Sequence, residues 1–222
     1  ETKLLLLDSP VLTSSDLLAI KGYWGTQFVE IDCTFDIQKE NLRAALSRIC
    51  LQAEEAVRGG FSNLILDEAG ISKNRAPIPM ILATGGIHSH LVANGLRTYT
   101  SINVCTAECL DVHYFAVLIG VGATTVNAYL AEHIIRDRHR RGLFSNVDLK
   151  TCLSNYTKAV DAGLLKIMSK MGIAVISSYR GGYNFEAVGL SRTLVGEFFP
   201  GMVSRISGIG LSGIEHKVLD QH

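Results

Sequence analysis

The chain has 222 residues, of which 47% are hydrophobic and 19% are charged, so it is long enough to bury the core of one α/β domain. Lysine plus arginine and aspartate plus glutamate number 21 each, and this balance gives no indication of a nucleic-acid or membrane partner. No stretch reaches the roughly 18 uninterrupted apolar residues of a membrane helix, and the acidic start lacks the positive region of a secretory signal.

The cysteines and the mean hydropathy indicate the compartment of the protein and whether the domain stands alone. The five cysteines are odd in number and lie in apolar surroundings, so we expect buried thiols in a reducing cytoplasm and no disulfides. The mean hydropathy of +0.24 is high for a free-standing domain. It indicates either apolar surface that neighbouring domains cover or a sheet that is mostly parallel.

Residues 1–27 are expected to form a leading segment ahead of the core. Within it, Thr13-Ser-Ser-Asp16 has the form of a capping box and predicts a short helix over 17–21. The alternation of apolar and polar residues then predicts a strand over 28–35. Apolar residues at spacings of three and four predict a helix over 38–58.

The same alternation of strand and helix continues through the core, which we expect to span residues 28–190. The further predicted strands are 63–66, 98–104, 123–128 and 174–178, and the further predicted helices are 80–94, 108–119, one that runs on towards Arg141, and 149–171. Elements at this spacing indicate βαβ units and a parallel sheet. Because about five strands are too few to close a (β/α)8 barrel, the predicted fold is α/β, with a parallel βα-repeat sheet that is open or resembles an incomplete barrel.

The stretch Leu164–Leu190 is expected to connect several of these elements. Its first part continues the long helix, MSKMG ends that helix, and AVISS is typical of a short buried strand. The following YRGGYNF is expected to turn into another helix. Residues 191–222 are then expected to form a helical or turn segment that leads towards a further domain.

Two motifs that suggest ligand binding have simpler interpretations. Gly208-Ile-Gly210-Leu-Ser-Gly213 has the spacing of a dinucleotide-binding loop, which needs a strand before it, a helix after it and an acidic residue about 20 positions on. Because the chain ends at His222, we expect a turn here and no nucleotide site. Cys105 and Cys109 lack a second cysteine pair elsewhere, so buried thiols are favoured over a metal site.

Histidine and arginine clusters also favour structural interpretations. His88 and His90 lie two residues apart on a predicted helix, where they point in nearly opposite directions and cannot chelate together. We expect one of them to be buried or at an interface and the other to be solvated. The basic cluster, interpreted as a solvated helix end, is Arg136, Arg138, Arg140 and Arg141 with His139.

Polar residues at the ends of the predicted strands are the remaining candidates for a site, because function in parallel sheets gathers at the carboxyl ends of the strands. These ends are expected to hold Thr34, Asp36, Asp67, Glu68, Asn103, Cys105, Asn127, Tyr129, Ser178 and Arg180. Asp67 and Glu68 could form an acid–base pair, although neighbours in a strand face opposite ways. Arg180 could hold an anion through its planar guanidinium, or brace an interface. No nucleophile–base pair accompanies them, so no catalytic, cofactor-binding or metal-binding residue is assigned.

Several short blocks, in order along nearly the whole chain, resemble the central domain of the glutamate synthase large chain. They are LLLLDSPVLT, RAPIPMILATGGIHSHLV, GLRT, DVHYFAVLIGVGATTVNAYLAE, KIMSKMGI with SYRG and FEAVGL, and SRISGIGL. The chain departs from the family pattern at Ala128, usually proline, and at Gly182, usually alanine. It also has Ser212 and Gly213 where an acidic residue usually follows GIGL.

The resemblance implies a part of an enzyme that transfers the amide nitrogen of glutamine to 2-oxoglutarate and reduces the product to glutamate. There, a central domain similar in topology to part of the flavin domain joins the glutamine amidotransferase domain to the domain with FMN and an iron–sulfur cluster. It implies that this domain has no catalytic residue or cofactor of its own, holds the two active centres apart, and walls part of an ammonia path. The five strand-end residues Thr34, Asp67, Glu68, Asn127 and Arg180 are then interface or tunnel candidates. The reductant (NADPH, NADH or ferredoxin) and any small reductase subunit would lie outside this chain.

Two other interpretations stay open. One is a free-standing flavin- or phosphate-binding α/β enzyme with its site at the strand ends near Arg180. The other is a binding module on the same scaffold whose contact surface is the basic helix end around Arg136–Arg141.

Overall fold

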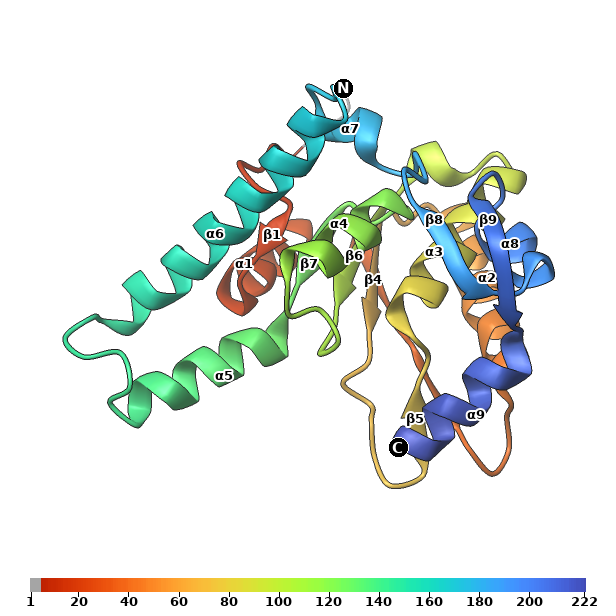
Figure 1. Ribbon diagram of the computed structural model, residues 1–222, viewed down its shortest axis with the longest axis horizontal. Coiled ribbons are helices and arrows are strands. Elements are labelled where there is room, and N and C mark those ends of the chain that lie inside the picture. The colour runs from red at the N-terminus through yellow and green to blue at the C-terminus, as the bar shows by residue number, and fades with distance from the viewer. Residues whose placement is uncertain (1–4) are drawn as a thin grey trace.

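The computed structural model describes residues 5–222, so residues 1–4 of the leading segment, with its acidic start, lie outside the described residues. Five short parallel strands form the central sheet in the order β1-β7-β6-β4-β2 (Figure 1). They are β1 (Val11–Leu12), β2 (Phe28–Asp32), β4 (Asn63–Asp67), β6 (Ser101–Cys105) and β7 (Thr125–Asn127). The register places Leu64 beside Ile102, and Val104 beside Val126.

The strand order explains why the sheet resembles part of a barrel. From β2 through β4 and β6 to β7, each strand lies beside the preceding one without a reversal of direction across the sheet. Right-handed crossovers between such strands place their helices on one face. These helices are α2 (Leu42–Arg58), α3 (Met80–Ala93) and α4 (Val112–Gly120), and α6 (Leu149–Lys170) joins them beside β1. With five strands this sheet stays open, and the prediction of an α/β fold with an incomplete βα barrel is confirmed.

The main hydrophobic core lies between this sheet face and the helices. Leu46 and Ile49 lie on the apolar stripe of α2, and they belong to the same buried cluster as Leu64 and Ile102 of the sheet. Full burial of each such side chain is worth about 1.5–3 kcal/mol. The spacing of three and four that predicted this helix therefore also predicted its buried face.

The opposite face of the sheet is polar and is covered by α1 (Ser14–Trp24), which lies across the sheet from α2 and α3 (Figure 1). Side chains of β4, β6 and β7 form a hydrogen-bonded row on this face. Ser101 Oγ donates to Asn63 Oδ1 (2.8 Å), Asn103 Nδ2 to Ser101 Oγ (2.9 Å), and Thr125 Oγ1 to Asn103 Oδ1 (2.7 Å). Because these groups satisfy one another, the polar face can be buried without orphaned donors. The capping box predicted at the start of α1 is confirmed.

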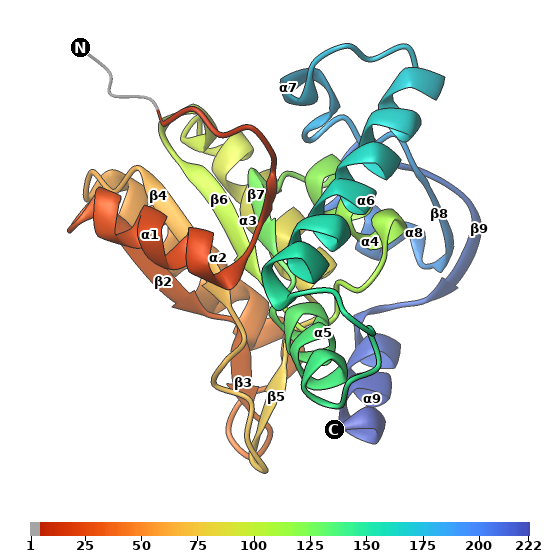
Figure 2. The same cartoon turned by 90° about the vertical axis from the view of Figure 1, so that its left-hand side faces the viewer.

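The helices α5 (Tyr129–Arg140) and α6 form a hairpin that extends away from the sheet (Figures 1 and 2). The basic cluster lies at its tip. There, Asp137 pairs with Arg140 at 2.5 Å and with Arg141 at 3.5 Å, and all three side chains are exposed. Such pairs contribute little to stability, so the cluster is the solvated helix end that we expected.

The prediction of a strand over 174–178 is wrong. Residues Ile176–Tyr179 form the one-turn helix α7, and Ala174 and Val175 are exposed. The physical reason is that the sheet edge beside β7, where a next strand in chain order would pair, is already occupied by β1. An apolar stretch without a strand neighbour has no reason to stay extended.

The prediction of a helix after YRGGYNF is also wrong. That segment leads into β8 (Glu186–Leu190), which pairs in parallel with β9 (Val203–Ile209), and α8 (Arg192–Phe198) lies between them. The remaining elements are the antiparallel ribbon of β3 (Thr34–Asp36) with β5 (Arg75–Pro77), and the 3-10 helix η1 (Arg97–Tyr99) before β6.

The Gly208–Gly213 motif, where we expect a turn, is followed by a helix. The motif joins β9 to α9 (Leu211–Gln221). Its first glycine serves strand packing, because a Cβ on Gly208 would lie 2.1 Å from the carbonyl oxygen of Gly189 in β8. Close approach of two backbones, and not of a phosphate, accounts for this glycine.

Candidate functional site at the carboxyl ends of the strands

An open cleft of about 670 Å³ lies at the carboxyl ends of β4, β6 and β7, between these strands, α1 and the start of α5. It contains three of the five predicted site residues. Its lining residues are Ser14, Leu17, Leu18, Lys21, Asp67, Glu68, Ala69, Ile71, Cys105, Asn127, Tyr129 and His133.

Glu68 is the most unusual residue of this cleft, because its carboxyl group is buried with only 1% of its surface exposed. The N–H of Ala107 donates to its Oε1, and Thr106 Oγ1 donates to its Oε2 at 3.1 Å. The Tyr129 hydroxyl donates to Oε1 at 3.4 Å. These donors hold the carboxyl group in one orientation between the segments that follow β4 and β6.

Burial raises the pKa of Glu68 from 4.5 to about 7, and the charge of Glu108 acts in the same direction. The Ala107 N–H opposes this shift, as do the Thr106 and Tyr129 hydroxyls, but burial prevails. A carboxyl group with a pKa near neutrality can hold or release a proton at ordinary pH. Glu68 can therefore donate or accept a proton at the cleft.

Asn127 lies at the end of β7 and connects the cleft to the leading segment. Its Nδ2 donates to the carbonyl oxygen of Leu12 (3.0 Å) and to Glu132 Oε1 (3.0 Å). Glu132 also accepts from the N–H of Ser14 (2.5 Å), and the Cys105 thiol donates to Asn127 Oδ1 (3.4 Å). All donors and acceptors of the Asn127 amide group are thus directed at structural partners, and it fixes α1 over the strand ends.

Asp67 and Cys105 complete the strand ends that face the cleft. Asp67 is half-buried, and its Oδ1 accepts from the N–H of Ala69 at 2.6 Å, which closes the turn after β4. Burial, together with the charge of Asp67, raises the pKa of the Cys105 thiol to about 12. That thiol stays protonated at neutral pH and is not a nucleophile.

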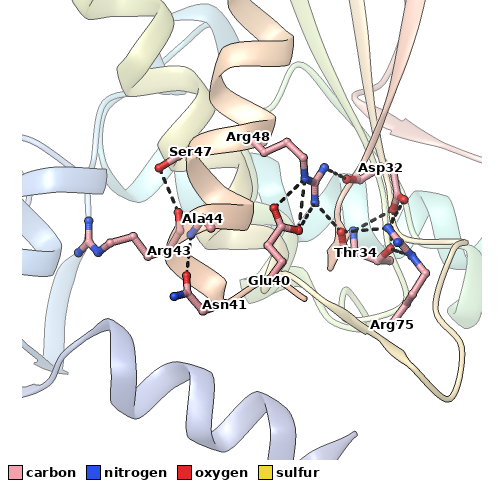
Figure 3. Close-up of polar contacts among 9 residues, drawn as sticks. All are labelled: Asp32, Thr34, Glu40, Asn41, Arg43, Ala44, Ser47, Arg48 and Arg75. Carbon is pink, nitrogen blue, oxygen red and sulfur yellow. Dashed lines mark hydrogen bonds and ion pairs between the residues drawn. The ribbon is translucent and has the colours of Figure 1, made fainter. Parts of the chain in front are cut away.

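Thr34 does not line the cleft. It is fully buried in the ribbon beyond β2, where Figure 3 shows Arg48 and Arg75 on either side of it. Arg75 Nε donates to its Oγ1 (2.9 Å), Arg48 donates to its carbonyl oxygen (2.7 Å), and Thr34 Oγ1 donates to Asp32 Oδ1 (2.7 Å). These contacts tie the ribbon to α2, with Glu40 as the carboxylate partner of Arg48 at 3.0 Å.

Arg180 is at the other end of the sheet, and the expectation that it ends a strand is wrong. It follows α7, and the turn after it rests on the last residues of α4, because Gly181 and Tyr183 donate to the carbonyl oxygens of Ile119 and Gly120. The end of α4 lies next to the amino-terminal edge of β7. The strand pattern that suggested a carboxyl end for Arg180 is the one that forms α7.

Sequence reasoning missed Lys21, Ser14, His133 and the buried Glu132. Lys21 comes from α1 and pairs with Glu30 of β2 at 2.5 Å. A weak signal for α1 existed in the capping box, but nothing in a capping box says which surface the helix will cover. Glu132 had a stronger signal, since it is an acidic residue within the apolar stretch NAYLAEHII.

The cleft brings several polar side chains together at the strand ends. These groups are the carboxyl group of Glu68, which has a pKa of about 7, the hydroxyl of Tyr129, and the amide of Asn127, which is hydrogen-bonded to structural partners. Within residues 5–222 no group of three or more His, Cys, Asp or Glu residues is arranged to hold a metal ion. Within the same range no helix is long and apolar enough to cross a membrane. Fold and cleft thus define an α/β domain with barrel-type winding and a polar cleft at its strand ends.

The chain belongs to the glutamate synthase central domain family, whose model matches residues 1–191. It is 62% identical to the NADPH glutamate synthase large chain of Azospirillum brasilense, over 100% of this chain and 15% of that relative. It is 39% identical to the chloroplastic ferredoxin-dependent glutamate synthase of Spinacia oleracea, over 96% of this chain and 14% of that relative. Identity to the NADH glutamate synthase of Saccharomyces cerevisiae is 35%, over 98% of this chain and 11% of that relative. The chain thus spans less than a sixth of each of these relatives.

Among solved structures, the fold is similar to a flavocytochrome b2 variant with sulfite bound. The TM-score is 0.50 at 14% sequence identity, over 77% of this chain and 38% of that chain. At this identity the likeness supports the fold alone. It agrees with the barrel-type winding of β2, β4, β6 and β7.

Proposed function

We propose that this chain is the coupling domain of a glutamate synthase that transfers the amide nitrogen of glutamine to 2-oxoglutarate and reduces the product to L-glutamate. In this role the domain holds a glutamine amidotransferase domain and a domain with FMN and an iron–sulfur cluster at a fixed separation. The family match along residues 1–191 carries the proposal. The relatives' names include NADPH, NADH and ferredoxin, so they leave the electron donor of the parent enzyme open.

The chemistry of the described residues supports a coupling role over a catalytic one. Burial raises the pKa of four thiols, those of Cys33, Cys50, Cys105 and Cys109, so none of them is an activated nucleophile. The Asp67 carboxylate at the cleft, joined by Glu68 whenever Glu68 is ionised, would repel the phosphate of FMN. FMN and the iron–sulfur cluster therefore belong, in this proposal, to adjoining parts of the polypeptide.

The alternative of a free-standing flavin- or phosphate-binding enzyme has less support. That alternative relied on Arg180 as the anion-binding residue at the carboxyl ends of the strands. Arg180 instead lies near their amino-terminal ends, away from the cleft. The cation that does line the cleft, Lys21, is already paired with Glu30. Among the cleft residues that the structure describes, Lys21 is the only lysine or arginine.

An exposed apolar surface supports contact with neighbouring domains. In the two-stranded sheet of β8 and β9, Val188 of β8 lies beside Ile206 of β9. These residues are 65% and 61% exposed. Parallel strands are normally covered on both faces. The four buried thiols favour a reducing compartment, and we place the parent enzyme in the cytoplasm.

For the cleft itself, we propose that Asp67, Glu68 and Asn127 wall part of the ammonia path between the two active centres. Ammonia is small and polar, and the carboxyl groups of Asp67 and Glu68 can accept hydrogen bonds from it. Asn127 would contribute to the wall only, because its amide group already bonds to structural partners. Thr34 and Arg180 lie outside the cleft, and for them only an interface role stays proposed.

The test is made in the full polypeptide that contains this chain, with Leu18→Trp as the variant. Leu18 lines the cleft with 71% of its side chain exposed, so a larger ring fills the cleft without disturbing the core. We expect glutamine hydrolysis to continue while reduction of 2-oxoglutarate falls, so that more glutamine is consumed than 2-oxoglutarate is reduced. The measurement compares the two rates in one assay.

Leu165→Trp is the matched control, because Leu165 is 65% exposed on α6 and is not part of the cleft. It should keep glutamine consumption and 2-oxoglutarate reduction equal. Equal rates in both variants would remove the cleft from the ammonia path. A full polypeptide without glutamine-dependent glutamate formation would overturn the proposed function as a whole.

A further inference from the structure

Side chains that can carry positive charge gather at the amino-terminal edge of the sheet, away from the cleft. His88 comes from α3, Arg97 from η1, and Arg180 follows α7. The Arg97 guanidinium donates to the carbonyl oxygens of Thr100 (2.6 Å) and Gly122 (2.8 Å), and its Nε donates to His88 Nδ1 (3.0 Å). All three nitrogens of Arg97 are therefore engaged, and its position is fixed.

The His88 ring joins Arg97 to the turn that carries Arg180. A Cβ would lie 2.5 Å from this ring at Gly122 and 2.8 Å at Gly181, and both glycines have a positive φ. Only glycine therefore lets the ring fit between these two segments. The N–H of Gly181 donates to a carbonyl oxygen in the last turn of α4, which holds the turn in place.

Arg180 differs from Arg97 in that its side chain has no hydrogen-bond or ion-pair partner among residues 5–222. Its side chain is partly buried, and its Nε is fully buried without a hydrogen-bond partner. Within residues 5–222, no carboxylate raises the pKa of Arg97 or of Arg180. The hydroxyl of the preceding Tyr179 is also buried without a partner.

The two arginines place positive charge in a site where the described part of the chain supplies no compensating negative charge. Burial, and in second place the charge of Arg180, lower the pKa of Arg97 to about 10, and burial lowers the pKa of Arg180. Burial also lowers the pKa of His88 to about 4, so the ring is neutral at pH 7 and adds no charge. Buried cations are normally paired, because desolvation is otherwise not offset.

We propose that Arg180, with Arg97 beside it, is an anion site that binds a carboxylate group. A guanidinium presents two parallel N–H groups that match the two oxygens of a carboxylate, and Arg180 has these donors free. Arg97 adds positive potential and positions His88 and the turn. The carboxylate comes either from a free small molecule or from an Asp or Glu side chain of the polypeptide outside residues 5–222. This site does not depend on the proposed synthase function, because it follows from the charges of the described residues alone.

The experiment is hydrogen exchange of residues 171–190 in the full polypeptide, for the wild type and for Arg180→Met. Methionine keeps the length and the apolar stem of the side chain and removes only its charge. If a carboxylate occupies the site, this change leaves that carboxylate unpaired, and exchange becomes faster, by about tenfold. Arg138→Met on the exposed face of α5 is the control and should leave these residues unchanged.

Acetate, added in place of chloride at constant ionic strength, separates the two sources. With a free carboxylate as the source, acetate slows exchange of residues 171–190 in the wild type and has no effect in Arg180→Met. With a side chain as the source, acetate changes neither, and Arg180→Met alone is faster than the wild type. The proposal is overturned if Arg180→Met exchanges as slowly as the wild type, or more slowly, in both salts. A buried cation without any anion would give that result, because its removal is then favourable.

Discussion

Glu68 and Thr34 are both buried polar residues near strand ends, yet their surroundings give them different roles. Thr34 is uncharged and each of its polar groups has a partner, so its burial costs little. Glu68 is ionisable, and its burial favours the protonated form even though three groups donate to it. At the scale of single residues, Thr34 thus has a structural role, whereas Glu68 is a group that can gain or lose a proton.

The raised pKa of Glu68 predicts a specific pH dependence of stability. The folded pKa of about 7 lies above the ordinary value of 4.5, so the folded state holds the proton more tightly than the unfolded state. The resulting stabilisation is fully present below pH 4.5 and is lost as the pH rises towards 7, with a total of about 3 kcal/mol. Urea unfolding of the wild type should therefore show a lower free energy of unfolding at pH 8 than at pH 5.

Glu68→Gln should remove most of this difference, because glutamine cannot ionise. Glu55→Gln, at an exposed position on α2, is the control and should keep the pH dependence of the wild type. If Glu68→Gln and the wild type lost the same free energy of unfolding between pH 5 and pH 8, Glu68 would have an ordinary pKa.

At the scale of elements, glycines decide how closely the helices approach. Gly163 lies inside α6 where this helix crosses α4, and a Cβ there would lie 2.5 Å from Cγ1 of Val112. Gly22 lies inside α1, and a Cβ there would meet no atom within 4 Å. The same residue type therefore has a packing role in one helix and none in the other.

This contrast predicts opposite effects of alanine. Gly22→Ala should stabilise the protein by about 0.5–1 kcal/mol, because alanine loses less conformational entropy in a helix. Gly163→Ala should destabilise it by about 1–3 kcal/mol, since overpacking between α4 and α6 outweighs that gain. Denaturant unfolding at constant pH measures both. Stabilisation by both substitutions would mean that α6 can move away from α4 at no cost.

At the scale of the whole molecule, the leading segment completes the sheet. β1 pairs with β7, and α1 covers the polar face and forms one wall of the cleft. Asn127 joins these parts through the carbonyl oxygen of Leu12 and through Glu132. The cleft therefore exists only when the first part of the chain is docked on the sheet, where β1 pairs with β7 more than 100 residues later.

Asn127→Ala should loosen this docking and leave the rest of the sheet intact. It removes the donor to the carbonyl oxygen of Leu12 and one of the donors to Glu132, which keeps the N–H of Ser14. The loss costs about 1–3 kcal/mol. Hydrogen exchange of residues 11–24 should become faster by about tenfold, while exchange in β4 and β6 stays unchanged. Asn94→Ala, at an exposed position after α3, is the control. Equal exchange in both variants would show that β1 pairing alone holds the segment.

Local patterns in the sequence determined most of the elements and the fold class. The apolar stripe of α2 and the capping box of α1 depend on neighbours within a few residues, so they can be recognised without the fold. The spacing of strands and helices determined the parallel sheet, because right-handed crossovers leave few alternatives. The same spacing placed Asp67, Glu68 and Asn127 at one edge of the sheet, where the cleft is.

Tertiary structure alone decided the rest, because the rest depends on partners far away in the chain. An apolar stretch becomes a strand only where a sheet edge is free, and β1 occupies the edge that residues 174–178 would have needed. For that reason α7 is a helix and Arg180 lies at the amino-terminal edge, beside Arg97. The pKa of Glu68 likewise depends on burial by distant segments, which no pattern of neighbouring residues records.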